Sequence, residues 1–411
     1  MGDVTARLTS LGGLVIMLAL ALLLSGARRR ISIRLVLAGL GLQLLFAVLV
    51  LRTALGRRFF EGAKHVFDVV LQASDTGASF LFGSLVNDFN IGAVVAFQVL
   101  PIVIFVSALA GILYYLRIIQ LVVRAMARVM RWAMNTSGAE SLACALFVFL
   151  GIEATTAIAE YIRRMTRSEL FTVMTGFMAT VAGSVMGAYA VFIGTENAGH
   201  LLAASVMSAP AAIVVAKIMM PETEEPLTRG RVRFEPPREA ANVIDAAARG
   251  AGQGLKLALN IGAMLIAFIG LVALVNLTLE AATDGWMAEP LTLERIFGYV
   301  FSPLALAMGV PWNDAAAVGQ LLGTKTVLNE FLAYQRMQGL IAQGVLSPRS
   351  IVISTYALCG FANFGSVAIL IGGLGSIDPD RKGVIARLGL RAIISGTLAA
   401  FMTACFAGIL A

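Results

Sequence analysis

The sequence predicts an all-α integral membrane protein with eight transmembrane helices and two oppositely oriented re-entrant hairpins in an inverted repeat. Of its 411 residues, 59% are hydrophobic and only 13% are charged, about half the charged fraction of a soluble domain. Apolar runs long enough to cross a bilayer as helices recur along the chain, and their lengths exclude a β-barrel. Two further apolar regions are interrupted by polar residues, which indicates hairpins that dip into the membrane and return.

Several other classes of function are disfavoured by the composition. The net charge of +7 arises from arginines between apolar spans, so it does not indicate a nucleic-acid partner. The three cysteines, Cys144, Cys359 and Cys405, lie inside apolar runs, and neither His65 nor His200 has a partner at ligand spacing. We find neither a nucleophile with its base nor a metal cluster, and therefore expect no enzyme and no cofactor.

The first part of the chain is predicted to form the periphery of the protein. Spans at 11–27 and 35–52 flank four arginines at 28–34, so the positive-inside rule places this linker in the cytoplasm and the N-terminus outside. Residues 53–90 mix charged and apolar side chains, as an interfacial helix does. A third span, at 93–116, returns to the cytoplasm.

An amphipathic helix is expected between this span and residue 136. Its arginines recur at helical spacing: Arg117, Arg124, Arg128 and Arg131. A position on the inner leaflet would suit them, because anionic lipid adds about 1 kcal/mol per basic residue. Membrane lipid is therefore an expected partner.

The first predicted hairpin, residues 137–166, is the element on which the functional reading depends. Two apolar arms of about ten residues each flank Gly151 and Glu153, so each arm reaches only about half of a ~30 Å hydrocarbon core. A carboxylate inside a membrane costs on the order of 3 kcal/mol and usually faces a cavity on a substrate or ion path. Glu153, at the tip, is therefore a candidate site residue.

The middle of the chain continues with predicted spans at 170–193 and 200–219. A polar cytoplasmic loop is expected from 221 to about 254, followed by a span at 256–279 that crosses outward. The arginines of the loop are Arg229, Arg231, Arg233 and Arg238. The segments assigned to the cytoplasm hold most of the 31 Lys and Arg residues, which supports this topology.

The last part of the chain repeats the pattern of a hairpin followed by two spans. The region 296–337 is broken by glycines and a proline, and its end carries Asn329 and Glu330, which predicts a second re-entrant hairpin. Spans at 350–374 and 388–410 complete the chain and leave the C-terminus outside. Because the first hairpin enters from the cytoplasm and the second from outside, the two units are inverted, as in many secondary transporters.

This organisation divides the chain into five parts. They are 1–92 (peripheral spans and interfacial helix), 93–136 (a scaffold span and the amphipathic helix), 137–220 (the first transport repeat), 221–295 (the loop, a scaffold span and an outer polar stretch) and 296–411 (the second transport repeat). A channel is a weaker reading, because nothing in the sequence resembles a selectivity filter.

Several motifs resemble the concentrative nucleoside transporter family. The matching stretches are SGAESL (137–142), MTRSEL (165–170), AGSVMGAY (182–189), HLLAASVMSAPAA (200–212), AKIMMPETE (216–224), GTKTVLNEF (323–331), LSPRS (346–350) and TYALCGFANFGS (355–366). The resemblance implies a homotrimer that imports nucleosides by symport with a cation, in a bacterial inner membrane with both termini periplasmic.

The resemblance also assigns residues to the substrate. The first hairpin and the span after it would contact the base, through Glu153, Ile152 and Val185. The second hairpin and the span at 350–374 would hold the ribose, through Glu330, Asn363, Ser366 and the adjacent Phe361. Carboxylates form strong charge-assisted bonds to hydroxyl groups, which suits such a ligand.

The tip of the first hairpin departs from the family pattern. The pattern reads Asn-x-Phe-x-Gly-Gln-Thr-Glu-Ala-Pro, whereas residues 147–155 read Phe-Val-Phe-Leu-Gly-Ile-Glu-Ala-Thr. The Asn that supplies a sodium ligand falls on Phe147, or on Leu146 if the gap lies earlier. The remaining sodium ligands would be the Thr180 hydroxyl and the carbonyls of Leu150 and Val181.

Two questions stay open at this point. Sodium coupling is weakened by the missing Asn, and proton coupling through Glu153 is the slightly favoured rival. The Gln and Thr that would read a base edge are reduced to Ile152, so a different ribosylated or hydroxylated solute is the alternative substrate.

Overall fold

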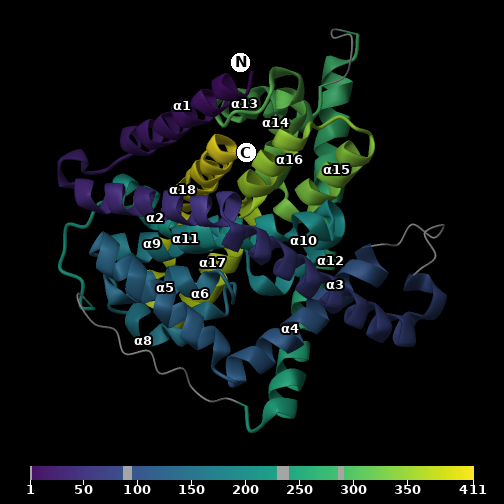
Figure 1. Ribbon diagram of the computed structural model, residues 1–411, viewed down its shortest axis with the longest axis horizontal. Helices are drawn as coiled ribbons and strands as arrows, with labels where there is room; N and C mark the ends of the chain where they lie inside the picture. Colours follow the sequence, from purple (N-terminus) through teal and green to yellow (C-terminus); the bar gives the residue numbers. More distant parts are fainter. Residues whose placement is uncertain (1, 87–94, 229–239, 286–290) are drawn as a thin grey trace.

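The computed structural model describes residues 2–86, 95–228, 240–285 and 291–411 (Figure 1). Every regular element within these ranges is a helix, as the composition predicts. The predicted boundary at 92–93, the start of the span expected at 93–116 and the four loop arginines (Arg229, Arg231, Arg233 and Arg238) lie outside the described residues.

Eight helical segments of the described chain are long and apolar enough to cross a membrane. Seven correspond to predicted spans, and the helices that form them are α1 (Gly2–Leu23), α2 (Ile33–Arg52), α4 (Leu100–Tyr115), α9 (Arg167–Ala179) with α10 (Gly183–Ile193), α11 (Ala198–Met219), α12 (Val243–Thr283) and α18 (Lys382–Leu410). The eighth contains α3 (Ala54–Phe82), where we expected an interfacial helix. Its length qualifies it, although Arg57, Arg58, Lys64 and Asp68 make it amphipathic.

The span expected at 350–374 is divided into two shorter helices, α16 (Pro348–Leu358) and α17 (Phe364–Ile377), separated by an extended stretch. Gly360 lies in this stretch with φ +147°, a conformation that a side chain would strain. The α9–α10 pair is interrupted in the same way at residues 180–182. Each repeat therefore contains one broken helix, which places unpaired helix ends inside the protein.

The two predicted hairpins are both present as helix–turn–helix units. The first consists of α6 (Gly138–Phe147), a turn, α7 (Ala154–Ala157) and α8 (Ala159–Ile162), so its outgoing arm is split at Ile158. The second consists of α14 (Trp312–Val327) and α15 (Glu330–Ala342). The region before it is more regular than its glycines suggested, because most of it forms one helix, α13 (Leu293–Ala307). The chain then turns at Gly309, φ +95°, so that α13 packs against α14.

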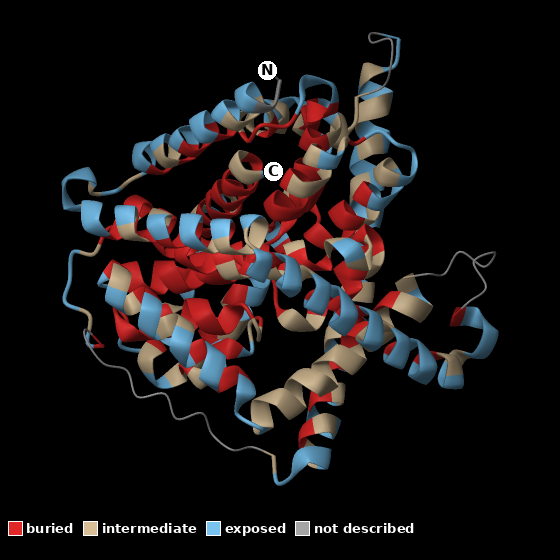
Figure 2. Cartoon of the chain, in the orientation of Figure 1, coloured by how far each residue is buried: buried red, intermediate tan, exposed pale blue. Residues whose placement is uncertain are grey.

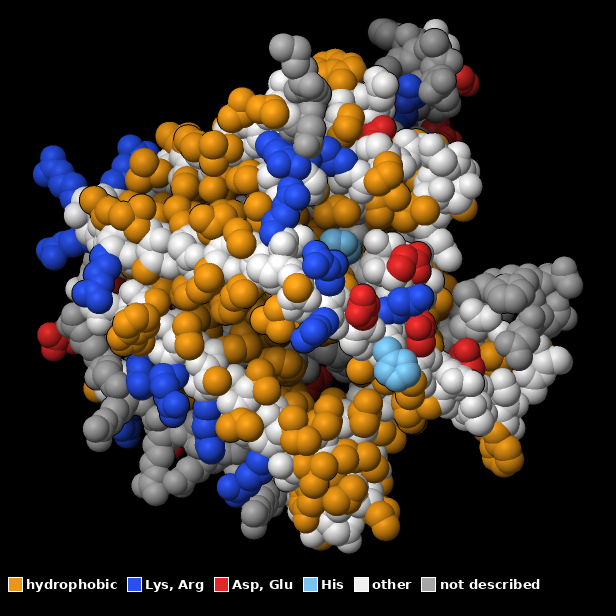
Figure 3. Space-filling model, viewed as in Figure 1, with side chains coloured by type: hydrophobic (Ala, Val, Ile, Leu, Met, Phe, Trp, Pro, Cys, Tyr) orange, Lys and Arg blue, Asp and Glu red, His pale blue; other side chains and the backbone are white. Residues whose placement is uncertain are grey.

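The helices of the repeats form the core. Figure 2 shows α6, α9, α11 and α18 as mostly buried ribbons, whereas α1, α2, α3 and the amphipathic α5 (Ile118–Met134) cover them with one exposed face. Most of the residues of α11 are buried, whereas only a few of the 41 residues of α12 are. Much of the exposed surface is apolar (Figure 3), which is expected of helices that face lipid.

Helix α12 begins at Val243, so the polar loop ends earlier than the predicted boundary near Gly254. The polar residues after Val243 form the first turns of a 41-residue helix that packs along α4. Glycines bring the two backbones together: a Cβ on Gly250 would lie 2.5 Å from the Ser107 carbonyl oxygen, and one on Gly254 would lie 2.7 Å from the Ile104 Cα. Small residues at such contacts permit close helix packing in membranes.

We predict that Gly250→Val lowers the thermal stability of the purified protein. The new side chain must separate α4 from α12, and overpacking costs about 1–3 kcal/mol. Thermal unfolding in detergent measures the effect. Gly252→Val is the matched control, because a Cβ there meets no atom within 4 Å. Equal melting temperatures for the two variants would refute the close packing.

Candidate functional site

Glu330 is a buried carboxylate with hydrogen-bond partners on two other helical elements. It is the first residue of α15 and is 5% exposed. The Tyr189 hydroxyl donates to Glu330 Oε1 at 2.7 Å, and the Asn363 amide donates to Oε2 at 3.0 Å. The carboxylate therefore joins α10, α15 and the break between α16 and α17, and it lies at a helix N-terminus, where negative charge is favoured.

Asn363 holds this arrangement from the second broken helix. Its Oδ1 accepts from the Ser366 backbone N–H at 2.8 Å, which caps the start of α17. Because the same side chain donates to Glu330, Asn363 links the helix start to the carboxylate. Three of the sequence-predicted ribose residues, Glu330, Asn363 and Ser366, are thus brought together in one buried place.

Aromatic rings surround the predicted ribose side. The Tyr189 ring stacks on Tyr334 of α15, with centroids 4.9 Å apart. Phe361, the fourth predicted ribose-side residue, packs instead on Phe177 of α9 at 5.4 Å, and Phe177 in turn contacts Phe147 at 5.7 Å. Phe147, Phe177 and Phe361 therefore form a chain of contacting aromatic rings. Phe147 is the residue that replaces the expected Asn.

The tip of the first hairpin is closed by its own hydroxyl groups. Thr155 Oγ1 donates to the Ile152 carbonyl and Thr156 Oγ1 to the Glu153 carbonyl, each at 2.7 Å. The Phe149 carbonyl accepts from the Gly183 N–H at 3.2 Å, so the tip is attached to the start of α10. The shortened tip is thus held by threonine at a position where the family pattern has proline.

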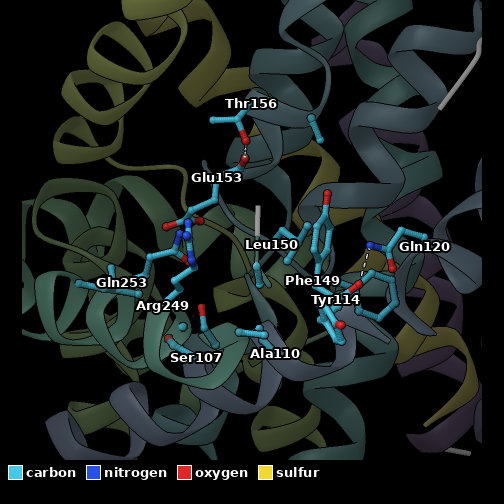
Figure 4. Close-up of a pocket in the computed structure, with 18 of the residues that line it drawn as sticks. Ser107, Ala110, Tyr114, Gln120, Phe149, Leu150, Glu153, Thr156, Arg249 and Gln253 are labelled. Atoms are coloured by element: carbon cyan, nitrogen blue, oxygen red, sulfur yellow. Dashed lines mark hydrogen bonds between the residues drawn. The ribbon is translucent and has the colours of Figure 1, made fainter. Parts of the chain in front are cut away.

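Glu153 is exposed and lines a cavity of about 180 Å³. The cavity lies between the hairpin tip on one side and helices α4 and α12 on the other (Figure 4). Its polar lining residues are Ser107, Tyr114, Tyr115, Arg117, Gln120, Glu153, Thr156, Ser184, Arg249 and Gln253.

The other predicted base-side residues do not line this cavity. Val185 is buried, 4% exposed, in the first turn of α10. Ile152 packs against α17, where a Cβ on Gly373 would lie 2.6 Å from its Cγ1. Glu330 and Asn363 are also absent from the lining. Of the predicted substrate residues, Glu153 is therefore the one that lines this cavity.

Two of the predicted sodium ligands, Thr180 and Val181, lie in the break between α9 and α10, and the third, Leu150, lies at the tip of the first hairpin. The Thr180 hydroxyl donates to the Gly176 carbonyl at 2.8 Å, and the Val181 carbonyl accepts from Ser205 Oγ of α11 at 3.0 Å. The Leu150 carbonyl accepts from the Ala154 N–H at 3.2 Å. Leu146 and Phe147 are both buried apolar side chains, so neither supplies an oxygen.

Two residues of this region carried no role in the sequence analysis. Tyr189, at the end of the AGSVMGAY stretch, is fully buried and bonds the central carboxylate; a hydroxyl in the middle of an apolar run was the available signal. Ser205 satisfies both the N–H (3.4 Å) and the carbonyl of Val181. It lies in another quoted stretch, but its partner depends on tertiary packing.

An all-helical chain with two hairpins, two broken helices and a buried polar cluster where they meet has the architecture of a secondary membrane transporter. Sequence comparison specifies the family. The models described as "Na+ dependent nucleoside transporter" match residues 200–408 (C-terminus) and 12–85 (N-terminus), and one described as "Nucleoside recognition" matches 96–196. The chain belongs to this family of nucleoside transporters, which confirms the resemblance seen in its motifs, and it is not an enzyme.

Full-length relatives agree with this assignment. "Uncharacterized transporter YutK" of Bacillus subtilis (strain 168) is 44% identical, over 96% of this chain and 97% of its own. "Nucleoside permease NupC" of Helicobacter pylori is 38% identical over 98% of both chains. The solved structure of CNTnw in an inward-facing substrate-bound state is 39% identical, with a TM-score of 0.90 over 98% of both chains. The protein is therefore a multi-pass membrane protein.

We predict that Tyr189→Phe destabilises the protein by about 1–3 kcal/mol, the usual cost of removing one partner of a buried polar group. The loss arises because Glu330 Oε1 no longer receives the Tyr189 hydroxyl. Chemical or thermal unfolding provides the measurement, with Tyr299→Phe, at a residue 69% exposed, as the control. A Tyr189→Phe protein as stable as the control would show that the 2.7 Å contact contributes nothing.

Proposed function

We propose that the protein imports nucleosides across the bacterial inner membrane by symport with a cation, and that Glu330 is the centre of its ribose subsite. The observation that carries this proposal is the buried Glu330 carboxylate, which Tyr189 and Asn363 hold where two helix starts meet. A ribose presents neighbouring hydroxyl groups, and a fixed carboxylate beside an amide can accept from and donate to them. Ser366 and Phe361 complete this side of the ligand.

The base subsite lies at the first hairpin. Glu153 faces the cavity and offers a carboxylate to N–H groups of a base. Val185 does not line the cavity but follows Ser184, which does, and the family resemblance assigns it an apolar contact to the base. Ile152 contributes packing to α17 instead of a hydrogen bond. The two subsites together match a ligand with a polyhydroxylated part and a planar polar part.

Both hairpins are re-entrant in this proposal. At 1.5 Å per residue, the ten-residue α6 and the 13-residue α15 are about 15 and 20 Å long, shorter than a ~30 Å hydrocarbon core. The proposal includes the division of the chain into five parts and the inverted topology of the two repeats. It also places both termini in the periplasm. Protomers associate as homotrimers, and the arginine-bearing face of α5 lies on lipid headgroups.

The coupling ion in this proposal is a proton. Of the positions where sodium ligands are expected, Thr180 offers a side-chain hydroxyl and Phe147 offers none, whereas hard cations require several oxygens. Glu153 is a carboxylate that faces a cavity and can exchange a proton with water. The family description includes sodium dependence, so Thr180 with the carbonyls of Leu150 and Val181 is the competing ion site.

A different ribosylated or hydroxylated solute is the second candidate substrate. The observation that favours it is Ile152, whose side chain packs at Gly373 and stands where the family pattern has an amide and a hydroxyl side chain. The ribose side is the same in both candidates.

We predict that Glu330→Gln and Asn363→Ala each weaken nucleoside binding by roughly tenfold or more, because a buried ligand hydroxyl is left unpaired. Binding to the purified protein by calorimetry provides the measurement, and Glu196→Gln, at an exposed carboxylate, is the control. If a 2′,3′-dideoxynucleoside binds as tightly as its parent, the ribose assignment is wrong.

We predict that uptake into proteoliposomes increases as the external pH falls, persists when choline replaces sodium, and collapses with a protonophore. Glu153→Gln should abolish accumulation but retain exchange, since exchange needs no net proton transfer. Glu160→Gln, an exposed carboxylate on the same hairpin, is the control. Uptake that saturates with sodium at fixed pH and disappears in choline would place sodium beside Thr180 instead.

A further inference from the structure

The cavity at Glu153 has two walls that belong to different parts of the protein. The hairpin tip and the start of α10 form one wall, with Phe149, Leu150, Glu153 and Ser184. Helices α4 and α12 form the other, with Ser107, Tyr114, Arg249, Gly250 and Gln253. In Figure 4, Glu153 and Arg249 point toward each other across this space, with Gln253 beside Arg249.

The hydrogen-bonding groups of the two walls are complementary. The hairpin tip contributes the side-chain carboxylate of Glu153 to the cavity but no amide. Ile152, which stands where the family pattern has an amide, packs at Gly373. The amide and the guanidinium come from α12, as Gln253 and Arg249. Together the walls therefore offer a strong acceptor on one side and several donors with an amide acceptor on the other.

Gln253 is free to bind a ligand. Its side chain is exposed and makes no hydrogen bond within the part of the chain that the structure describes. Arg249 uses Nε to contact both carboxylate oxygens of Asp245, at 3.1 and 3.2 Å, which leaves its two terminal nitrogens as donors. The Asp245 contact also limits the directions that the Arg249 side chain can take.

The position of α12, which carries Arg249 and Gln253, is set by its close packing on α4. Gly250, between Arg249 and Gln253, lies against the Ser107 carbonyl with no room for a Cβ, and Gly254 lies against α4 one turn further on. One helical turn separates Arg249 from Gln253, so both side chains project from the same face of α12. The spacing of the amide and the guanidinium is therefore set by a packed helix pair.

We propose that Gln253 and Arg249 of α12 are specificity-determining residues that select purine nucleosides, replacing the base-reading residues that the hairpin tip lacks. An amide of this type pairs with N6 and N7 of adenine, and a guanidinium pairs with O6 and N7 of guanine. Both pairings use N7, which pyrimidines do not have. Glu153 then accepts an N–H of the same base from the opposite wall.

This proposal rests on the proposed function, because it places the base at Glu153. It adds that the base subsite is shared between the hairpin and the α4–α12 pair. The subsite is complete only where the hairpin tip faces α12, so the base contacts form and break as the repeats move relative to this pair.

The test is an affinity panel on the full-length purified protein with adenosine, guanosine, uridine and cytidine. The unaltered protein should bind each purine nucleoside about tenfold more tightly than uridine. Gln253→Leu should remove most of the adenosine preference and Arg249→Met most of the guanosine preference, with uridine affinity little changed. Lys256→Met, at an exposed cation of the same helix that does not line the cavity, should retain both preferences.

Melting temperatures without ligand establish that each variant is folded, and Gln253→Asn, shorter by one methylene, replaces any Gln253→Leu protein that is not. An unaltered protein without purine preference, or affinity ratios that neither substitution changes, would overturn the proposal. Equal loss of affinity for all four nucleosides would also overturn it. Glu330→Gln, measured in parallel, distinguishes a failure of the proposed function from a failure of this proposal. If Glu330→Gln retains full binding, the ribose assignment of the proposed function is wrong.

Discussion

The buried carboxylate of Glu330 is the constraint on which the rest of the structure depends. Placing a charge in a protein interior within a membrane costs several kcal/mol unless hydrogen bonds compensate. The compensation comes from Tyr189 and Asn363, on different helices, so α10, α15 and the broken α16–α17 pair must meet at one point. Asn363 can reach the carboxylate only because α16 ends before it and α17 starts after it. The helix break, the hairpin and the polar cluster are thus one arrangement.

The first repeat accommodates its carboxylate and its helix break in a different way. Its carboxylate, Glu153, faces a cavity, and the backbone at its helix break bonds to the Phe149 carbonyl and to the Ser205 hydroxyl. The Asn, Gln and Thr that the family pattern places at the tip are absent, and the tip is closed by Thr155 and Thr156. The carboxylate of the second repeat is therefore buried and hydrogen-bonded, whereas that of the first repeat faces a cavity that Arg249 and Gln253 of α12 also line.

The helices, the hairpins and the family could be predicted from the sequence, because apolar periodicity and local motifs determine them. Within the site, the quoted motifs led to Glu330, Asn363 and Ser366, which the structure brings together. The partner of Glu330, Tyr189, could not be predicted, because the contact depends on how α10 packs on α15. Nor could the start of α12 at Val243, whose polar first turns resemble a loop, or the direction of Ile152, which depends on the room left by Gly373.

The central claim is that one nucleoside is held between Glu330 and Glu153, ribose at the former and base at the latter. An experimental structure with a bound nucleoside tests this claim most directly. The account predicts ribose hydroxyls within hydrogen-bonding distance of Glu330 and Asn363, and the base in the cavity between Glu153 and α12. A nucleoside whose ribose lies away from Glu330, or whose base lies outside that cavity, would contradict it.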